Sequence, residues 1–382
     1  MANTFLKRKL TLQRLWEVYS SKIPLWGHLF LALTSFALLL APVTNWQQPY
    51  YDSIHLAGPL ALTLMSTMLS MPSFIWSIVT VAGIVLLSIL LLRLKVEPAV
   101  AAFWAFVVLC TTIILPMSKC MWLESVVMTL WAGLVLVSVD LRTSLSLKLN
   151  ILFAILLLIS VLLYLPSILL VPIFTNYALA RKIPEIKNRF IYSFIIILTS
   201  VVALVGIAMI FNVHFWDSLS MINIFNLPLA LWTVLFSPGR SLFLYSPVLI
   251  VAVIGYLDMI DSDLEFARLY TGIVVVATTG ILLLEGVFTR QTYSGEPFIV
   301  LLPFLFIPLA WIKLERKVLK FFFVFSVISG FIFQLVLHEP ISLNQWNNKE
   351  IEKVYLPSDS PVFRWLTGNF VHSKFTCQKK NS

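Results

Sequence analysis

The chain has 382 residues, of which 59% are hydrophobic and only 12% are charged, and its mean hydropathy is +0.93. Soluble domains carry about 25% charged residues, so a water-soluble globule of this composition would lack the polar surface needed to cover itself. The same composition excludes a disordered chain, a collagen and a disulfide-rich scaffold. The sequence therefore predicts an all-α, polytopic integral membrane protein.

The N-terminal segment, residues 1–26, is basic and is followed by an apolar run from about Leu25 to Val43. That run is long enough to cross the hydrocarbon of a bilayer, and it is longer than the apolar region of a secretory signal. We expect residues 1–26 to form a basic amphipathic segment in the cytoplasm and the run to be retained as the first span.

Residues 27–338 are predicted to form the transmembrane domain, because apolar runs follow one another throughout this region. The runs lie at about 27–45, 74–93, 98–116, 121–140, 149–164, 167–180, 190–212, 241–258, 269–286, 297–312 and 318–338. The two short runs that meet at Pro166 favour a tight hairpin of short helices, since proline breaks a continuous helix. The pattern predicts about eleven transmembrane helices.

The distribution of Lys and Arg predicts the orientation of these spans. Most of the 27 basic residues fall on the side of the N-terminus, whereas the loops of the opposite side contain only Lys119, Arg240 and Arg290. Because Lys and Arg gather on the cytoplasmic side, we expect a cytoplasmic N-terminus and an extracytoplasmic C-terminal tail at 339–382. The net charge of +9 is thereby explained by orientation, and no nucleic-acid partner is predicted.

Ionisable residues on the predicted outer face are the candidates for function. Charged groups at membrane depth are costly unless they pair or line a wet cavity. The candidates of this kind are Asp52, Glu124, Arg240, Arg290 and Glu296. Asp52 is the only acidic residue between the first two predicted spans.

The run from Ser237 to Pro247 is the most informative stretch of the sequence. Pro238 and Gly239 predict a turn, and Arg240 follows them at the mouth of a predicted helix. An arginine in that place suits bidentate binding of a phosphate or a carboxylate. The alternative is an interfacial arginine that anchors the span by reaching to the membrane surface.

The residues LFSPGRSLFLYSPVLI at 235–250 resemble a segment of bacterial polytopic membrane glycosyltransferases of the GT-C superfamily, in which an SPGRGL-x-x-YSP run opens a transmembrane helix. Further segments are similar to the family in the same order. They are the segment from Leu115 to Ser125, the paired short helices of 151–182, Tyr293–Pro297 with Leu301–Phe304, Gln334 and Ser360-Pro361.

The resemblance implies a GT-C-like fold in a bacterial plasma membrane, with an outward-facing cavity for a polyprenyl-phosphate sugar donor. It implies transfer of the sugar to an acceptor on the extracytoplasmic face, with Asp52 as base or metal ligand and Glu124 as a second carboxylate or metal ligand. Arg240 and Arg290 would neutralise the departing lipid phosphate. The remaining implied substrate-binding residues are Ser237, Tyr293 and Glu296. Membrane lipid is the second partner, and whether a divalent metal ion takes part stays open.

Departures from the family pattern leave other functions open. The first outer loop lacks the adjacent acidic pair of the family, and Glu296-Pro297 stands where an arginine is expected. A GT-C-shaped protein without transferase activity is therefore one alternative. A lipid or glycolipid transporter, favoured by Pro166 and Pro172 within predicted helices, is another, and a structural subunit of a membrane assembly is a third.

Overall fold

The computed structural model describes residues 57–71, 74–112, 114, 122–144, 146–180, 183, 185–210, 227–228, 231, 235, 242–285, 298–314 and 317–338. The predicted N-terminal segment, first span and C-terminal tail lie outside these residues. The helices are α3 (Pro59–Ser70), α4 (Phe74–Arg93), α5 (Pro98–Thr111), α7 (Trp122–Thr143), α8 (Leu147–Leu163), α9 (Ser167–Leu179), α10 (Ile186–Ile210), α13 (Leu242–Tyr245), α14 (Val248–Ser262), α15 (Leu264–Glu285), α16 (Leu302–Leu305), the 3₁₀ helix η4 (Ile307–Trp311) and α17 (Lys317–His338).

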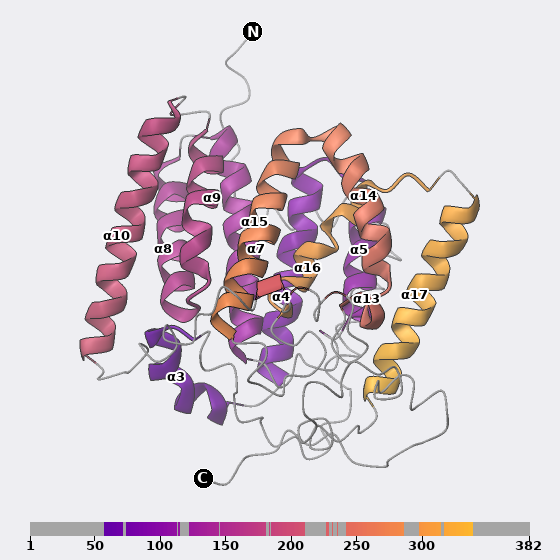
Figure 1. Ribbon diagram of the computed structural model, residues 1–382, viewed down its shortest axis with the longest axis horizontal. Coiled ribbons are helices and arrows are strands. Elements are labelled where there is room, and N and C mark those ends of the chain that lie inside the picture. The colour runs from indigo at the N-terminus through magenta and orange to yellow at the C-terminus, as the bar shows by residue number, and fades with distance from the viewer. Residues whose placement is uncertain are drawn as a thin grey trace.

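The helices form a bundle of roughly parallel and antiparallel rods, with α10 and α17 at its two margins (Figure 1). Each predicted apolar run from 74–93 onward contains helix, and within the described residues the only β pairing is an isolated bridge. The prediction of an all-α membrane protein is confirmed at this level. Among the described residues, four helices are long and apolar enough to cross a bilayer, namely Ile75–Arg93, Trp122–Thr143, Lys187–Ile210 and Leu264–Leu283. The total of about eleven spans stays a prediction.

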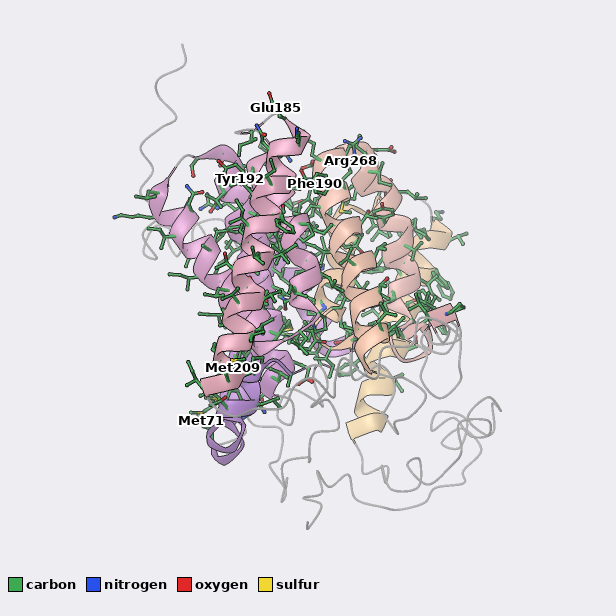
Figure 2. All side chains as sticks on the ribbon, turned by 60° about the vertical axis from the view of Figure 1, so that its left-hand side comes forward. Met71, Glu185, Phe190, Tyr192, Met209 and Arg268 are labelled. Carbon is green, nitrogen blue, oxygen red and sulfur yellow. The ribbon has the colours of Figure 1, made fainter. Side chains whose placement is uncertain are left out.

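Charge divides the bundle into two ends. The charged end is the one at which Arg93, Arg142 and Arg268 lie, and the opposite end is the one at which α3 and Glu124 lie. Figure 2 shows Glu185 and Arg268 at the charged end, with Met71 and Met209 at the opposite end. Among the residues that the structure describes, every charged residue except Glu124 and Glu285 lies at the charged end.

The hairpin predicted around Pro166 is present. The helix α8 ends at Leu163, the turn occupies Tyr164–Pro166, and α9 begins at Ser167. The Trp131 indole Nε1 lies 3.0 Å from the hydroxyl oxygens of both Ser160 and Ser167, and the Ser160 hydroxyl donates to Ser167 at 2.9 Å. These buried hydrogen bonds fasten the two arms of the hairpin to α7.

The helix α3 lies between the first two predicted spans, where the sequence predicts no helix. Gly58 precedes it, and Pro59 stands at its first position, where the fixed φ of proline is already helical and its missing N–H is no loss. The helix lies at the opposite end of the bundle and contacts α8 and α10 (Figure 1). It therefore covers part of the opposite end of α8 and α10.

The predicted run at 297–312 is not one continuous helix. It consists of the short α16 and the 3₁₀ helix η4, which are separated at Phe306. Pro308 has no N–H to donate to the carbonyl four residues earlier, so the α-helical ladder stops there. The Trp104 indole donates to the Phe306 carbonyl at 2.7 Å, and this satisfies one polar group of the break inside the core.

The C-terminal end of α4 offers a stability test that does not involve the candidate site. Lys95 has a φ of 66°, and the N–H groups of Lys95 and Val96 donate to the Leu92 and Leu91 carbonyls. This is the helix-ending arrangement in which glycine is favoured. Lys95→Gly is expected to raise the free energy of unfolding by about 1 kcal/mol, measured by thermal unfolding in detergent. An unchanged or lower melting temperature would contradict this expectation. The control is Lys148→Gly, which places a glycine in the first turn of α8 and is expected to lower the melting temperature.

Candidate functional site

Glu124 is the one predicted site residue that the structure describes. It lies in the first turn of α7, at the opposite end of the bundle, and only 1% of its surface is exposed. A negative charge in the first turn of a helix is stabilised by the helix dipole. The adjacent Trp122 packs on Trp76 of α4, with 6.1 Å between the ring centroids. The structure thus places a carboxylate inside the protein, in the turn of α7 that packs on α4.

The interface between α4 and α7 holds the start of α7 in place. The Thr80 hydroxyl donates to the Ser125 hydroxyl at 2.8 Å, and the Thr129 hydroxyl donates to the Val79 carbonyl at 2.8 Å. At Gly83 a Cβ atom would lie 2.8 Å from the Thr129 hydroxyl oxygen and 3.2 Å from the Thr129 Cα, so α4 and α7 are closely packed at this point. Because α4 and α7 are in contact at this point, the position of Glu124 is fixed by rigid elements.

The face of α7 that carries Glu124 continues to the α8–α9 hairpin. Glu124 and Trp131 are seven residues apart, which puts them on the same side of the helix and about 10 Å apart along its axis. The Trp131 ring packs edge-on against Tyr164, at 5.8 Å between centroids, and against Phe304 of α16, at 6.2 Å. Glu124 is therefore closer to the opposite end of the bundle than Trp131, and the Trp131 ring contacts both the hairpin and the broken 298–311 segment.

The chain segment after Asp52 is fastened to the same hairpin. Ala57 forms a bridge with Tyr164, and the Gly58 N–H donates to the Leu163 carbonyl at 2.8 Å. A Cβ atom at residue 58 would lie 2.2 Å from the Leu162 carbonyl oxygen, so only glycine allows this approach. Asp52 lies outside the described residues. It is five residues before Ala57 in the sequence.

The other predicted site residues also lie outside the described residues, but the segments next to them are described. Ser237 and Arg240 precede the buried Leu242 of α13, and Arg290, Tyr293 and Glu296 precede the buried Phe298. Leu242 lies at the opposite end, because α14 runs from there to Asp258 at the charged end. The segment with Arg290, Tyr293 and Glu296 follows α15, which runs from Leu264 at the charged end to Glu285 at the opposite end. The flanks of all the predicted site segments thus share one end with Glu124.

The structure also shows buried polar residues that are not among the predicted site residues. Trp131, Ser160 and Ser167 form a buried hydrogen-bonded group below Glu124, and only their polar type within apolar runs would have drawn attention to them. Within the described ranges there is no group of three or more His, Cys, Asp and Glu side chains that could hold a metal ion. Glu124 is the predicted carboxylate whose surroundings the structure describes.

The charged end contains a second set of interactions, which are ion pairs and a cation–π contact between helices. Arg142 of α7 pairs with Glu265 of α15, and its guanidinium carbon lies 4.7 Å from the centre of the Tyr177 ring of α9. Arg93 and Asp140 approach to 3.8 Å between α4 and α7. Arg93 and Arg142 are among the basic residues whose distribution predicts the orientation of the chain, and in the structure they also join helices.

Comparison with known protein families, with curated proteins and with solved structures finds no match to this chain.

Proposed function

We propose that the protein is a membrane glycosyltransferase, which moves a sugar from a polyprenyl-phosphate donor to an acceptor on the extracytoplasmic face. In this proposal the N-terminus is cytoplasmic, and the charged end of the bundle faces the cytoplasm. The opposite end, with Glu124, then faces outward. The chain would cross the bilayer about eleven times in a GT-C-like arrangement.

One observation carries the proposal. The Glu124 carboxylate is 1% exposed and lies at the opposite end of the bundle. The described residues that flank the segments with Asp52, Arg240 and Arg290 lie at the same end. Charged groups are costly within a membrane unless they pair or line a wet cavity. Several candidate ionisable residues at one end of the bundle therefore favour a functional site over separate membrane anchors. The attachment of Gly58 to the α8–α9 hairpin supports a location of Asp52 near the same region.

The proposed chemistry follows from the residue types. The Asp52 carboxylate would accept the proton of the acceptor hydroxyl as the bond between sugar and phosphate breaks. Arg240 and Arg290 would hold the departing phosphate, on which negative charge develops. Ser237, Tyr293 and Glu296 would contact the donor, and Glu124 would act as a second carboxylate that orients the acceptor.

The test is an assay of sugar transfer by the full chain in vesicles, with a polyprenyl phosphate that carries a labelled hexose or pentose. Asp52→Asn and Arg240→Ala are each expected to lower turnover about a hundredfold, since each removes a group used in the transition state. Glu124→Gln keeps the shape of the side chain and is expected to lower turnover as well.

Lys148→Gln is the matched control, because Lys148 lies at the charged end, in the first turn of α8. Its turnover is expected to equal that of the unchanged protein. Transfer that is unaffected by Asp52→Asn and by Arg240→Ala would overturn the site assignment. No transfer by the unchanged protein, with transport of the labelled lipid across the vesicle membrane instead, would favour the transporter alternative.

A further inference from the structure

The turn of the α8–α9 hairpin has a fixed position inside the bundle. The Trp131 indole of α7 donates to the hydroxyls of both Ser160 and Ser167 at 3.0 Å, so one N–H group ties the two arms of the hairpin to α7. From the side of α15, a Cβ atom at Gly280 would lie 3.4 Å from the Pro166 Cβ, which shows that this helix also packs on the turn. The turn is therefore held by two neighbouring helices.

The segment just before α3 is fastened to this turn. Ala57 pairs with Tyr164 in an antiparallel bridge, and the Gly58 N–H donates to the Leu163 carbonyl at 2.8 Å. That carbonyl belongs to the last turn of α8, where a helix has no N–H group of its own to pair with it. Since Ala57 and Gly58 are buried, the bond pairs two backbone groups that would be costly to leave unpaired.

The closeness of the turn, and not the backbone angles, requires glycine at residue 58. Gly58 has a φ of −76° and a ψ of 169°, which is an extended conformation that any residue adopts. A Cβ atom there would lie 2.2 Å from the Leu162 carbonyl oxygen and 2.7 Å from its carbonyl carbon. Both atoms belong to the backbone at the end of a helix, so an alanine at residue 58 has to move the segment away from the hairpin.

The chain after Gly58 is fixed as well. The helix α3 begins at Pro59 and contacts α7, α8 and α10. Its Leu62 N–H donates to the Gly58 carbonyl at 3.1 Å, so both backbone groups of Gly58 are bonded, one to the hairpin and one to α3. Asp52 precedes Gly58 by six residues in the sequence. The hairpin turn is thus the first described attachment of the chain after Asp52.

From these contacts we propose that the turn of the α8–α9 hairpin positions the segment that carries Asp52, with Gly58 and Trp131 as positioning residues. Trp131 fixes the turn, the turn fixes Gly58, and Gly58 fixes the end of the segment that carries the base. This inference rests on the proposed function of Asp52. It gives the hairpin a part in the reaction that is separate from proton transfer and from phosphate binding.

The test is a double-mutant cycle in the transfer assay, with the full chain in vesicles. Gly58→Ala and Trp131→Phe are each expected to lower turnover about tenfold, because a base that is displaced from its reacting position loses much of its effect. In the Asp52→Asn protein each is expected to change turnover by less than about twofold, since the group that they position is already absent. A purely structural role would give the same factor in both backgrounds.

Hydrogen exchange tests the contact between the turn and the segment separately. In Trp131→Phe, the Gly58 amide is expected to exchange about tenfold faster than in the unchanged protein, because the turn that accepts its hydrogen bond is held less firmly. Trp131→Phe keeps an aromatic ring and removes the indole N–H. Ser160→Ala/Ser167→Ala removes the same hydrogen bonds from the side of the hairpin and is expected to have the same effect on exchange.

The matched control is Trp104→Phe, which also removes a buried indole hydrogen bond, the one of 2.7 Å from α5 to the Phe306 carbonyl. This variant is expected to leave the exchange of the Gly58 amide unchanged and to alter turnover by the same factor with and without Asp52→Asn. Melting temperatures and size-exclusion profiles in detergent verify that each variant folds.

Three outcomes would count against the inference. Unchanged turnover in Gly58→Ala, or the same loss in both backgrounds, would overturn it and leave the proposed function standing. Unchanged exchange of the Gly58 amide in both Trp131→Phe and the double serine variant would overturn the part of Trp131. Absence of transfer by the unchanged protein would overturn the proposed function, and this inference with it.

Discussion

Gly255→Val is expected to destabilise the protein by about 3 kcal/mol, because it forces α14 away from the broken 298–311 segment. A Cβ atom at residue 255 would lie 2.3 Å from the Pro308 carbonyl oxygen and 2.9 Å from the carbonyl carbon. Both atoms belong to the backbone and have no rotamer by which to move aside. The strain would therefore be relieved only by a shift of a whole element.

The chain offers a matched control for this substitution. Gly206 is also a helical glycine, in α10, and a Cβ atom there would meet nothing within 4 Å. Gly206→Val is expected to change stability by less than about 0.5 kcal/mol. The measurement is the melting temperature of each variant in the same detergent. Equal melting temperatures for the two variants would show that α14 and η4 do not depend on this close approach.

Arg142→Ala is expected to destabilise the protein by about 3 kcal/mol. The Arg142 side chain is only 10% exposed and interacts with both Glu265 and Tyr177, so its loss removes an ion pair and a cation–π contact together. It also releases the contact among α7, α9 and α15. The expected result is a lower melting temperature in detergent.

Two further substitutions test the unequal burial of the two side chains in the Arg142–Glu265 ion pair. Glu265 is 58% exposed, so Glu265→Gln is expected to cost no more than about 1 kcal/mol. Arg142→Lys keeps the charge but loses the planar group that lies over the Tyr177 ring, and an intermediate melting temperature is expected. A larger drop in melting temperature for Glu265→Gln than for Arg142→Ala would contradict the expectation that the buried Arg142 side chain contributes more to stability.

The candidate site was predictable only in part. The sequence singled out Glu124 from its acidic type beside an apolar run, and the structure adds its burial and its position above Trp131. Asp52, Arg240 and Arg290 remain predictions from residue type and resemblance. The fastening of Gly58 to Leu163 was not foreseeable, because it joins segments more than a hundred residues apart and depends on the absence of one side chain.

The sequence by itself determined where most of the helices lie, with α3 and the break at Phe306 as exceptions, and that these helices suit a membrane. Hydropathy is a local property, and in hydrocarbon the backbone has to satisfy its own hydrogen bonds, so long apolar runs become helices in the expected places. The turn at Pro166 was determined in the same way, because proline limits the backbone wherever it stands.

Only the tertiary structure decided how those helices meet. The break at Phe306 is stabilised by an indole from α5, and Arg142 finds its partners on α9 and α15. These contacts join residues that are far apart in the chain, and no periodicity encodes them. They arise because packed helices leave each buried polar group a few neighbours, which depend on the positions of all the other helices.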